Sequence, residues 1–133
     1  MILVDTNVLL DIATNDPTWA SWSIESLDAA STIGPVVVNG VIYCEFSVGY
    51  ERIEDVERRL TDVDIGWVEI PREALFLAGK AFHTYRRHGG RRTGVLPDFF
   101  IGAHAAVSGM TLLTRDASRY RTYFPTVSLV SPF

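Results

Sequence analysis

The fold is decided by the stretch that opens the chain, Ile2-Leu3-Val4-Asp5-Thr6-Asn7-Val8-Leu9-Leu10-Asp11. Its apolar run stops at a carboxylate, a pattern typical of a buried parallel strand with an acid at its carboxyl end. Ligands of open α/β sheets bind outside that end of the strands. Asp5 is equally suited to be the N-cap of a helix over residues 7–13. This stretch alone therefore leaves Asp5 as either a cap or a functional acid.

Strands and helices alternate along the rest of the chain. Short apolar runs predict strands over residues 36–38, 66–70, 110–114 and 127–130. Amphipathic or apolar segments predict helices over residues 17–30, 41–50, 51–63, 71–85 and 98–107, with a short helix or turn over residues 118–124. This alternation indicates a three-layer α/β/α fold with a central, mostly parallel sheet. We find no repeat or linker, so residues 1–133 are expected to form a single domain.

Length and composition narrow the class of protein. A chain of 133 residues, 47% of them hydrophobic, is long enough to bury the core of one domain. Cys44 is the single cysteine, which excludes an internal disulfide and a cysteine-based zinc site. No apolar run approaches membrane-spanning length, and the first strand leaves no room for a signal peptide. We therefore expect a cytoplasmic protein with no membrane partner.

The charges of the chain are segregated along the sequence. Residues 1–51 contain seven acids and no arginine or lysine, although the net charge of the whole chain is only −4. All twelve basic residues lie between Arg52 and Arg121, and eleven of them are arginines. Arginine is the side chain suited to bidentate contact with phosphate. The acidic balance argues against a broad, non-specific nucleic-acid binder, but the arginines leave a local phosphate contact open.

Four acids stand at positions where a functional site is expected. Asp5 and Asp116 follow predicted strands, Glu45 is the only charge on a nearly all-apolar helix, and Asp98 lies in the first turn of a helix. Right-handed crossovers would bring all four to the same sheet edge. Each also has a structural explanation, because Asp98 suits a helix cap and a buried Glu45 could be paired with an arginine.

The four carboxylates together predict a metal site. Like charges in a small pocket raise one another's pKa unless a cation neutralises them. Oxygen ligands without clustered histidine or cysteine favour Mg²⁺ or Mn²⁺, and we expect Asp5, Asp98 and Asp116 to be the metal ligands. Such a site is typical of metal-assisted phosphodiester hydrolysis.

Nearby arginines would hold the flanking phosphates. The loop over residues 86–94 carries four arginines among glycines, and Arg91, Arg92 and Arg115 are the predicted substrate contacts. Solvated charges that complement the preceding helix C-terminus are the alternative explanation of the loop.

Four motifs together resemble a known family. They are Asp5-Thr6-Asn7 after the first strand, Glu45 in its helix, the run from Pro97-Asp98 to Ala105, and Leu113-Thr114-Arg115-Asp116. In this order the chain resembles the PIN-domain nucleases, specifically the VapC-type toxins of bacterial toxin–antitoxin pairs. The resemblance implies a Mg²⁺- or Mn²⁺-dependent endoribonuclease that cleaves RNA, forms a homodimer and is neutralised by a cognate antitoxin. It makes Asp5, Glu45, Asp98 and Asp116 the catalytic acids, with Asn7 and Thr114 as polar support.

Two other functions stay open at this stage. An aspartate after the first strand is also the nucleophile of aspartyl-phosphate phosphatases, although these enzymes need a nearby lysine and Lys80 is expected in mid-helix. A catalytically inactive PIN-like protein-binding module would pair through Trp19 and Trp22. Of the remaining polar residues, His104 is expected to be a core or surface histidine, and Asp11 a surface or helix-end acid.

Overall fold

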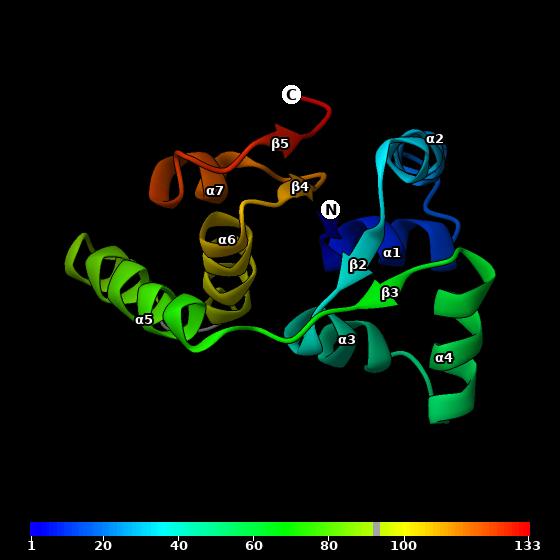
Figure 1. Cartoon of the computed structure of the whole chain (residues 1–133), viewed down its shortest axis with the longest axis horizontal. Helices are drawn as coiled ribbons and strands as arrows, with labels where there is room; N and C mark the ends of the chain where they lie inside the picture. Colours follow the sequence, from blue (N-terminus) through cyan, green and yellow to red (C-terminus); the bar gives the residue numbers. More distant parts are fainter. Residues whose placement is uncertain (92–93) are drawn as a thin grey trace.

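A five-stranded, all-parallel sheet forms the centre of the computed structural model, which describes residues 1–91 and 94–133. The strands are β1 (Ile2–Val4), β2 (Val36–Val38), β3 (Gly66–Trp67), β4 (Thr111–Leu113) and β5 (Leu129–Val130), in the spatial order β3-β2-β1-β4-β5. Helices flank the sheet, as Figure 1 shows. The predicted three-layer α/β/α fold is confirmed.

Seven helices connect the strands within the described residues. They are α1 (Thr6–Ala13), α2 (Ala20–Ile33), α3 (Gly40–Ser47), α4 (Ile53–Asp62), α5 (Arg72–Arg87), α6 (Leu96–Ser108) and α7 (Ser118–Tyr123). The predicted helix over residues 17–30 begins later, because the Asp16 carboxylate accepts hydrogen bonds from the backbone N–H groups of Thr18 and Trp19 and makes a turn there. Over the described residues, none of these helices combines the length and the apolar character needed to cross a bilayer.

The strand register aligns three polar residues along one edge of the sheet. Val4 pairs with Leu113, so Asp5 and Thr114 follow adjacent strand ends. Asn39 follows β2 on the other side of β1, where Leu3 pairs with Val37. The strand order reverses between β1 and β4, which is the position where open α/β sheets form a crevice. The topology therefore points to the end of β1 as the place for a site.

Apolar side chains of all three layers form the core. Leu3, Val4, Ile42, Phe99 and Leu112 are among its fully buried members. Helices α5 and α6 pack closely along one another, and in Figure 1 they lie on the far side of the sheet from α2 and α4. Helix α6 also packs against α3 and β4.

Helix α3 differs from the sequence-based expectation of burial on nearly every face. Ile42 and Phe46 are buried, whereas Val48, just beyond the helix, is 85% exposed and Glu45 is only half-buried. Among its helix neighbours, α3 packs mainly against α1 and α6, which leaves the rest of its surface open to solvent. Ile53 on α4 and Leu75 on α5 are also exposed.

Candidate active site

Asp5 is a buried acid, 4% exposed, at the carboxyl end of β1. Its Oδ1 accepts a hydrogen bond from the backbone N–H of Thr6 at 2.7 Å, which caps α1. Its Oδ2 accepts hydrogen bonds from Thr114 Oγ1 and Tyr120 Oη, both at 2.8 Å. The structure thus confirms the cap, and the second oxygen of the same carboxylate is held by two hydroxyl groups.

An open pocket of about 540 Å³ brings three of the four predicted acids together. Asp5, Glu45 and Asp98 all line it, from the end of β1, from α3 and from the first turn of α6. Thr6 Oγ1 donates a hydrogen bond of 2.7 Å to Glu45 Oε1 and so ties α3 to the start of α1. The other lining residues are Thr6, Asn7, Leu10, Val48 and Gly49.

Asp116, the fourth predicted acid, lies beside this pocket and does not line it. It is exposed in the segment between β4 and α7, and Ser118 Oγ donates a hydrogen bond of 3.3 Å to its Oδ1. Its backbone N–H donates to Thr114 Oγ1 at 3.2 Å. Its charge still reaches the pocket, because it contributes to raising the pKa of Asp98.

Burial in the pocket disfavours the charged forms of its acids and raises their pKa values. Burial raises the pKa of Asp5 to about 6, and the neighbouring charge of Asp98 adds to the shift against the hydrogen bonds that lower it. Burial also raises the pKa of Glu45 and of Asp98 above their ordinary values. Nearby positive charge would therefore be bound favourably in this pocket.

The two predicted supporting residues connect the strand ends. Asn7 Nδ2 lies 3.3 Å from Thr114 Oγ1 and 3.4 Å from Asp5 Oδ2. Asn7 Oδ1 accepts a hydrogen bond of 3.0 Å from the backbone N–H of Arg115. Asn7 and the fully buried Thr114 thus hold the segment after β4 against Asp5.

Arg115 is bound to another acid of the chain. Its Nε and Nη2 donate to the two carboxylate oxygens of Asp11 at 2.8 and 3.0 Å, and Trp19 lies beneath its guanidinium at 5.5 Å. Asp11 also accepts a hydrogen bond of 2.9 Å from Ser23 Oγ and is 2% exposed. Asp11 lies in the last turn of α1, as one of its two expected placements has it. The other, a surface acid, was wrong, because Asp11 is buried and Arg115, far away in sequence, neutralises it.

The predicted arginine loop is only partly described. Arg91 is exposed, and its backbone N–H donates a hydrogen bond of 3.2 Å to Tyr85 Oη. Arg92 lies outside the described residues. The arginine that the structure does show at the pocket acids comes from α7 instead.

Two residues of α7 belong to the site and were missed from the sequence. Tyr120 is buried and donates its hydroxyl hydrogen to Asp5, and burial together with that acid raises its pKa well above the ordinary value. Arg119 Nη1 lies 2.5 Å from Asp98 Oδ2, and its guanidinium lies 5.7 Å from the ring of Tyr85. The only sequence signal was the tyrosine- and arginine-rich composition of this segment, which does not say where the side chains point.

The donor set fits a hard divalent cation in its chemistry. Asp5, Glu45 and Asp98 offer only oxygen ligands, two of them substantially buried, and burial raises the pKa of all three. In the described part of the chain, no three acid, histidine or cysteine side chains are close enough to hold one ion together. Asp98 is turned to Arg119 in this arrangement.

Four further side chains, a histidine, two tryptophans and a lysine, lie away from the pocket acids. His104 is buried on α6 and pairs with Asn39 Nδ2 through Nδ1 at 3.0 Å, which confirms a core histidine. Trp19 and Trp22 are both half-buried and meet edge to face with ring centroids 6.3 Å apart. Lys80 is exposed on α5, over the ring of Phe76, and is not among the residues that line the acidic pocket.

Comparison with known proteins settles the family. The PIN domain family model matches residues 2–125, nearly the whole chain. The chain belongs to the PIN domain family. No curated protein matches it.

Solved structures that share this PIN fold include toxin–antitoxin complexes. VapBC2 from Rickettsia felis, bound to a promoter DNA fragment, superposes with a TM-score of 0.74 at 16% identity, covering 98% of each chain. VapBC-1 from nontypeable Haemophilus influenzae gives 0.70 at 18% identity, again covering 98% of each chain. FitAcB from Neisseria gonorrhoeae gives 0.67 at 19% identity, covering 99% of this chain and 98% of the other. At these identities the likeness establishes the fold.

Proposed function

We propose that this PIN-domain protein is a divalent-metal-dependent endoribonuclease of the VapC type, the toxin of a toxin–antitoxin pair. The observation that carries the proposal is the pocket in which Asp5, Glu45 and Asp98 meet at the carboxyl edge of the sheet. Family membership and the toxin–antitoxin complexes among the structural neighbours support it. The proposed cofactor is Mg²⁺ or Mn²⁺, and the proposed substrate is RNA.

The residues of the pocket have distinct tasks in hydrolysis. Bound at Asp5, Asp98 and Asp116, the metal would supply an activated water and stabilise negative charge on the phosphate. Thr114 and Tyr120 hold Asp5 in one orientation. Glu45, half-exposed and with a raised pKa, is placed to accept the proton of the attacking water through Oε2, because Thr6 occupies its Oε1.

Arg119 is the cation already present at the site. Its ion pair with Asp98 compensates that carboxylate while no other cation is bound. Its guanidinium would also be available to a phosphate of the substrate, to which it can donate two hydrogen bonds.

A cognate antitoxin is the proposed protein partner. A small, mainly apolar pocket between α1, α2, α3 and α4 offers an anchoring point, and Leu9, Ile12, Leu27, Phe46 and Leu60 are among its lining residues. The structural neighbours are complexes with partners of this kind.

A homodimer is also proposed. Val48, Ile53 and Phe76 are 85%, 64% and 69% exposed. Val48 follows α3, and Ile53 and Phe76 lie on α4 and α5; Figure 1 shows these three helices along the lower side of the molecule. Large apolar side chains exposed to water favour burial against another protein surface, here that of a second copy of the chain. Measurement of the molar mass in solution tests this, since a dimer that Phe76→Glu converts to a monomer supports it and a monomeric wild type contradicts it.

The ribonuclease is tested by incubating total RNA with the purified chain and Mn²⁺ and mapping the cut ends. Wild type should produce discrete ends that EDTA prevents and that Glu45→Gln strongly reduces. Asp28→Asn, which removes an exposed acid on α2, is the matched control and should cut as wild type does. Cutting that is unaffected by EDTA, or equal in wild type and Glu45→Gln, would contradict the proposal.

A further inference from the structure

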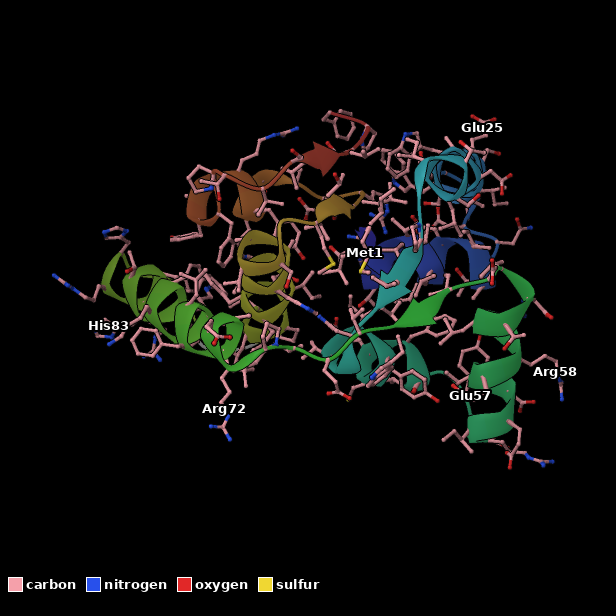
Figure 2. The ribbon with its side chains drawn as sticks, in the orientation of Figure 1. Met1, Glu25, Glu57, Arg58, Arg72 and His83 are labelled. Atoms are coloured by element: carbon pink, nitrogen blue, oxygen red, sulfur yellow. The ribbon has the colours of Figure 1, made fainter. Side chains whose placement is uncertain are left out.

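A basic pocket of about 380 Å³ lies on the last turns of α5, apart from the acidic pocket. Gly79, Phe82, His83, Arg86 and Arg87 line it. Their spacing of three and four residues places them on one face of the helix. Figure 2 shows the labelled His83 side chain projecting from the outer side of α5 into solvent.

The cations of this pocket have no acidic partner in the described residues. There, the arginines in ion pairs are Arg52, Arg58, Arg115 and Arg119, and none of these is on α5. The first turn of α5 holds its only acid, Glu73, and its last turn holds Arg86 and Arg87. The helix dipole favours cations at this end, but it amounts to about half an elementary charge. The two guanidinium groups therefore keep most of their capacity to bind an anion.

Aromatic contacts connect the basic pocket to the acidic one. Arg119, which pairs with Asp98, lies 5.7 Å from the ring of Tyr85 on α5. Tyr85 in turn stacks with Phe82 at 6.0 Å between centroids and 28° between planes. Phe82 is half-buried and forms an apolar wall of the basic pocket. A strand of RNA has phosphates for the guanidinium groups and flat bases for such a wall.

We propose that this α5 pocket binds a backbone phosphate of the single-stranded RNA substrate, through Arg86, Arg87 and His83, with the adjoining base against Phe82. This inference rests on the proposed function, because the RNA bound in the α5 pocket would be the same RNA that the acidic pocket cleaves. The pocket would hold the strand at a distance from the cut and so contribute to affinity and to the choice of cutting position.

Gly79 permits a test that leaves the cations in place. A side chain added at Gly79 meets no atom within 4 Å of its Cβ, and both Glu and Gln favour helix more than Gly. Gly79→Glu puts a carboxylate into the pocket, and Gly79→Gln puts in the same volume without charge. Binding of an RNA oligonucleotide is measured by fluorescence anisotropy over a series of salt concentrations in EDTA, which prevents cleavage. The Glu variant should bind more weakly than the Gln variant, with a flatter salt dependence.

A second pair of variants tests the arginines directly. Arg86→Ala/Arg87→Ala should lower the slope of log affinity against log salt by about 0.7 for each RNA phosphate that the pocket no longer neutralises. Arg58→Ala/Arg59→Ala makes the same change of charge on α4, and Figure 2 shows Arg58 on the opposite side of the view from His83. The α4 pair should leave RNA binding close to that of wild type.

The outcomes distinguish a failure of the α5 pocket from a failure of the proposed ribonuclease. Equal binding by Gly79→Glu and Gly79→Gln, or equal losses of affinity from the two arginine pairs, would overturn the inference. So would a Gly79→Glu variant that no longer binds inorganic phosphate but keeps RNA binding, since the pocket would then be a site for free phosphate. If the variants behave as expected while wild type cuts no RNA with Mn²⁺, the pocket stands and the ribonuclease fails.

Discussion

At the scale of single residues, Asp5 shows how one carboxylate can serve the fold and the site together. It caps α1 through Oδ1 and presents Oδ2 to two hydroxyl groups at the pocket. Its position after a buried strand was predictable, because an apolar run that ends at an acid needs no knowledge of the tertiary structure. Its partner Tyr120 was not, because 115 residues separate the two in the sequence.

The raised pKa of Asp5 predicts how stability depends on pH in the absence of metal. The folded protein holds the Asp5 proton up to about pH 6, whereas the unfolded chain releases it near the ordinary pKa of 3.8. The folded state therefore binds more protons between these values, and the free energy of unfolding falls as pH rises through this window. A pKa shift of about two units corresponds to a change of at most roughly 3 kcal/mol in the free energy of unfolding.

Urea denaturation of wild type and Asp5→Asn in EDTA, from pH 4 to 7, measures this contribution. The free energy of unfolding of wild type minus that of the variant should decrease up to about pH 6 and then become constant. A difference that does not change with pH would show that Asp5 has an ordinary pKa.

The ion pair of Arg115 and Asp11 predicts a second effect at this scale. Arg115→Ala leaves a carboxylate that is 3% exposed without its cation, which should destabilise the protein by about 3 kcal/mol. Arg115→Ala combined with Asp11→Ala removes both charges and should be more stable than Arg115→Ala alone. Thermal unfolding of wild type, the two single variants and the double variant gives a double-mutant cycle. If the losses of stability of the single variants add up to that of the double variant, the ion pair does not stabilise the fold.

At the scale of elements, strand positions were predictable and helix surroundings were not. The predicted runs at residues 36–38 and 110–114 are β2 and β4 within two residues, because a buried parallel strand is apolar on both faces. The apolar composition of α3 suggested burial that the structure lacks, and Val48 and Ile53 are exposed nearby. Composition reports how apolar an element is, but which partner covers it depends on tertiary contacts and on other molecules.

The packing of Phe124, the residue just after α7, against α6 depends on a glycine. A Cβ at Gly102 would lie 2.3 Å from the ring of Phe124, so Gly102→Ala forces the aromatic side chain to move. We expect a loss of stability of about 2 kcal/mol. Gly79→Ala is the matched control, since its Cβ meets nothing and it should stabilise α5 by about 0.5–1 kcal/mol. Chemical denaturation measures both, and a neutral Gly102→Ala would mean that Phe124 relocates freely.

At the scale of the whole molecule, the topology turns a dispersed set of acids into one pocket. Asp5, Glu45 and Asp98 are widely separated in sequence and come together because β1 lies between β2 and β4 at the reversal of strand order. Alternating strands and helices predicted the sheet edge and therefore this convergence. The position of Asp116 just outside the pocket and the capture of Arg115 by Asp11 depend on side-chain geometry that no sequence pattern specifies.

The proposed activity requires the clustered carboxylates to cleave RNA with a divalent metal. Its most direct test measures how fast wild type, Asp98→Asn and the surface control Asp28→Asn each cleave one RNA substrate over a series of Mn²⁺ concentrations. We expect metal-dependent saturation for wild type and the control, and a rate at least about 100-fold lower for Asp98→Asn at saturating metal. Equal rates for Asp98→Asn and wild type, or cleavage that does not depend on Mn²⁺, would contradict the proposed activity.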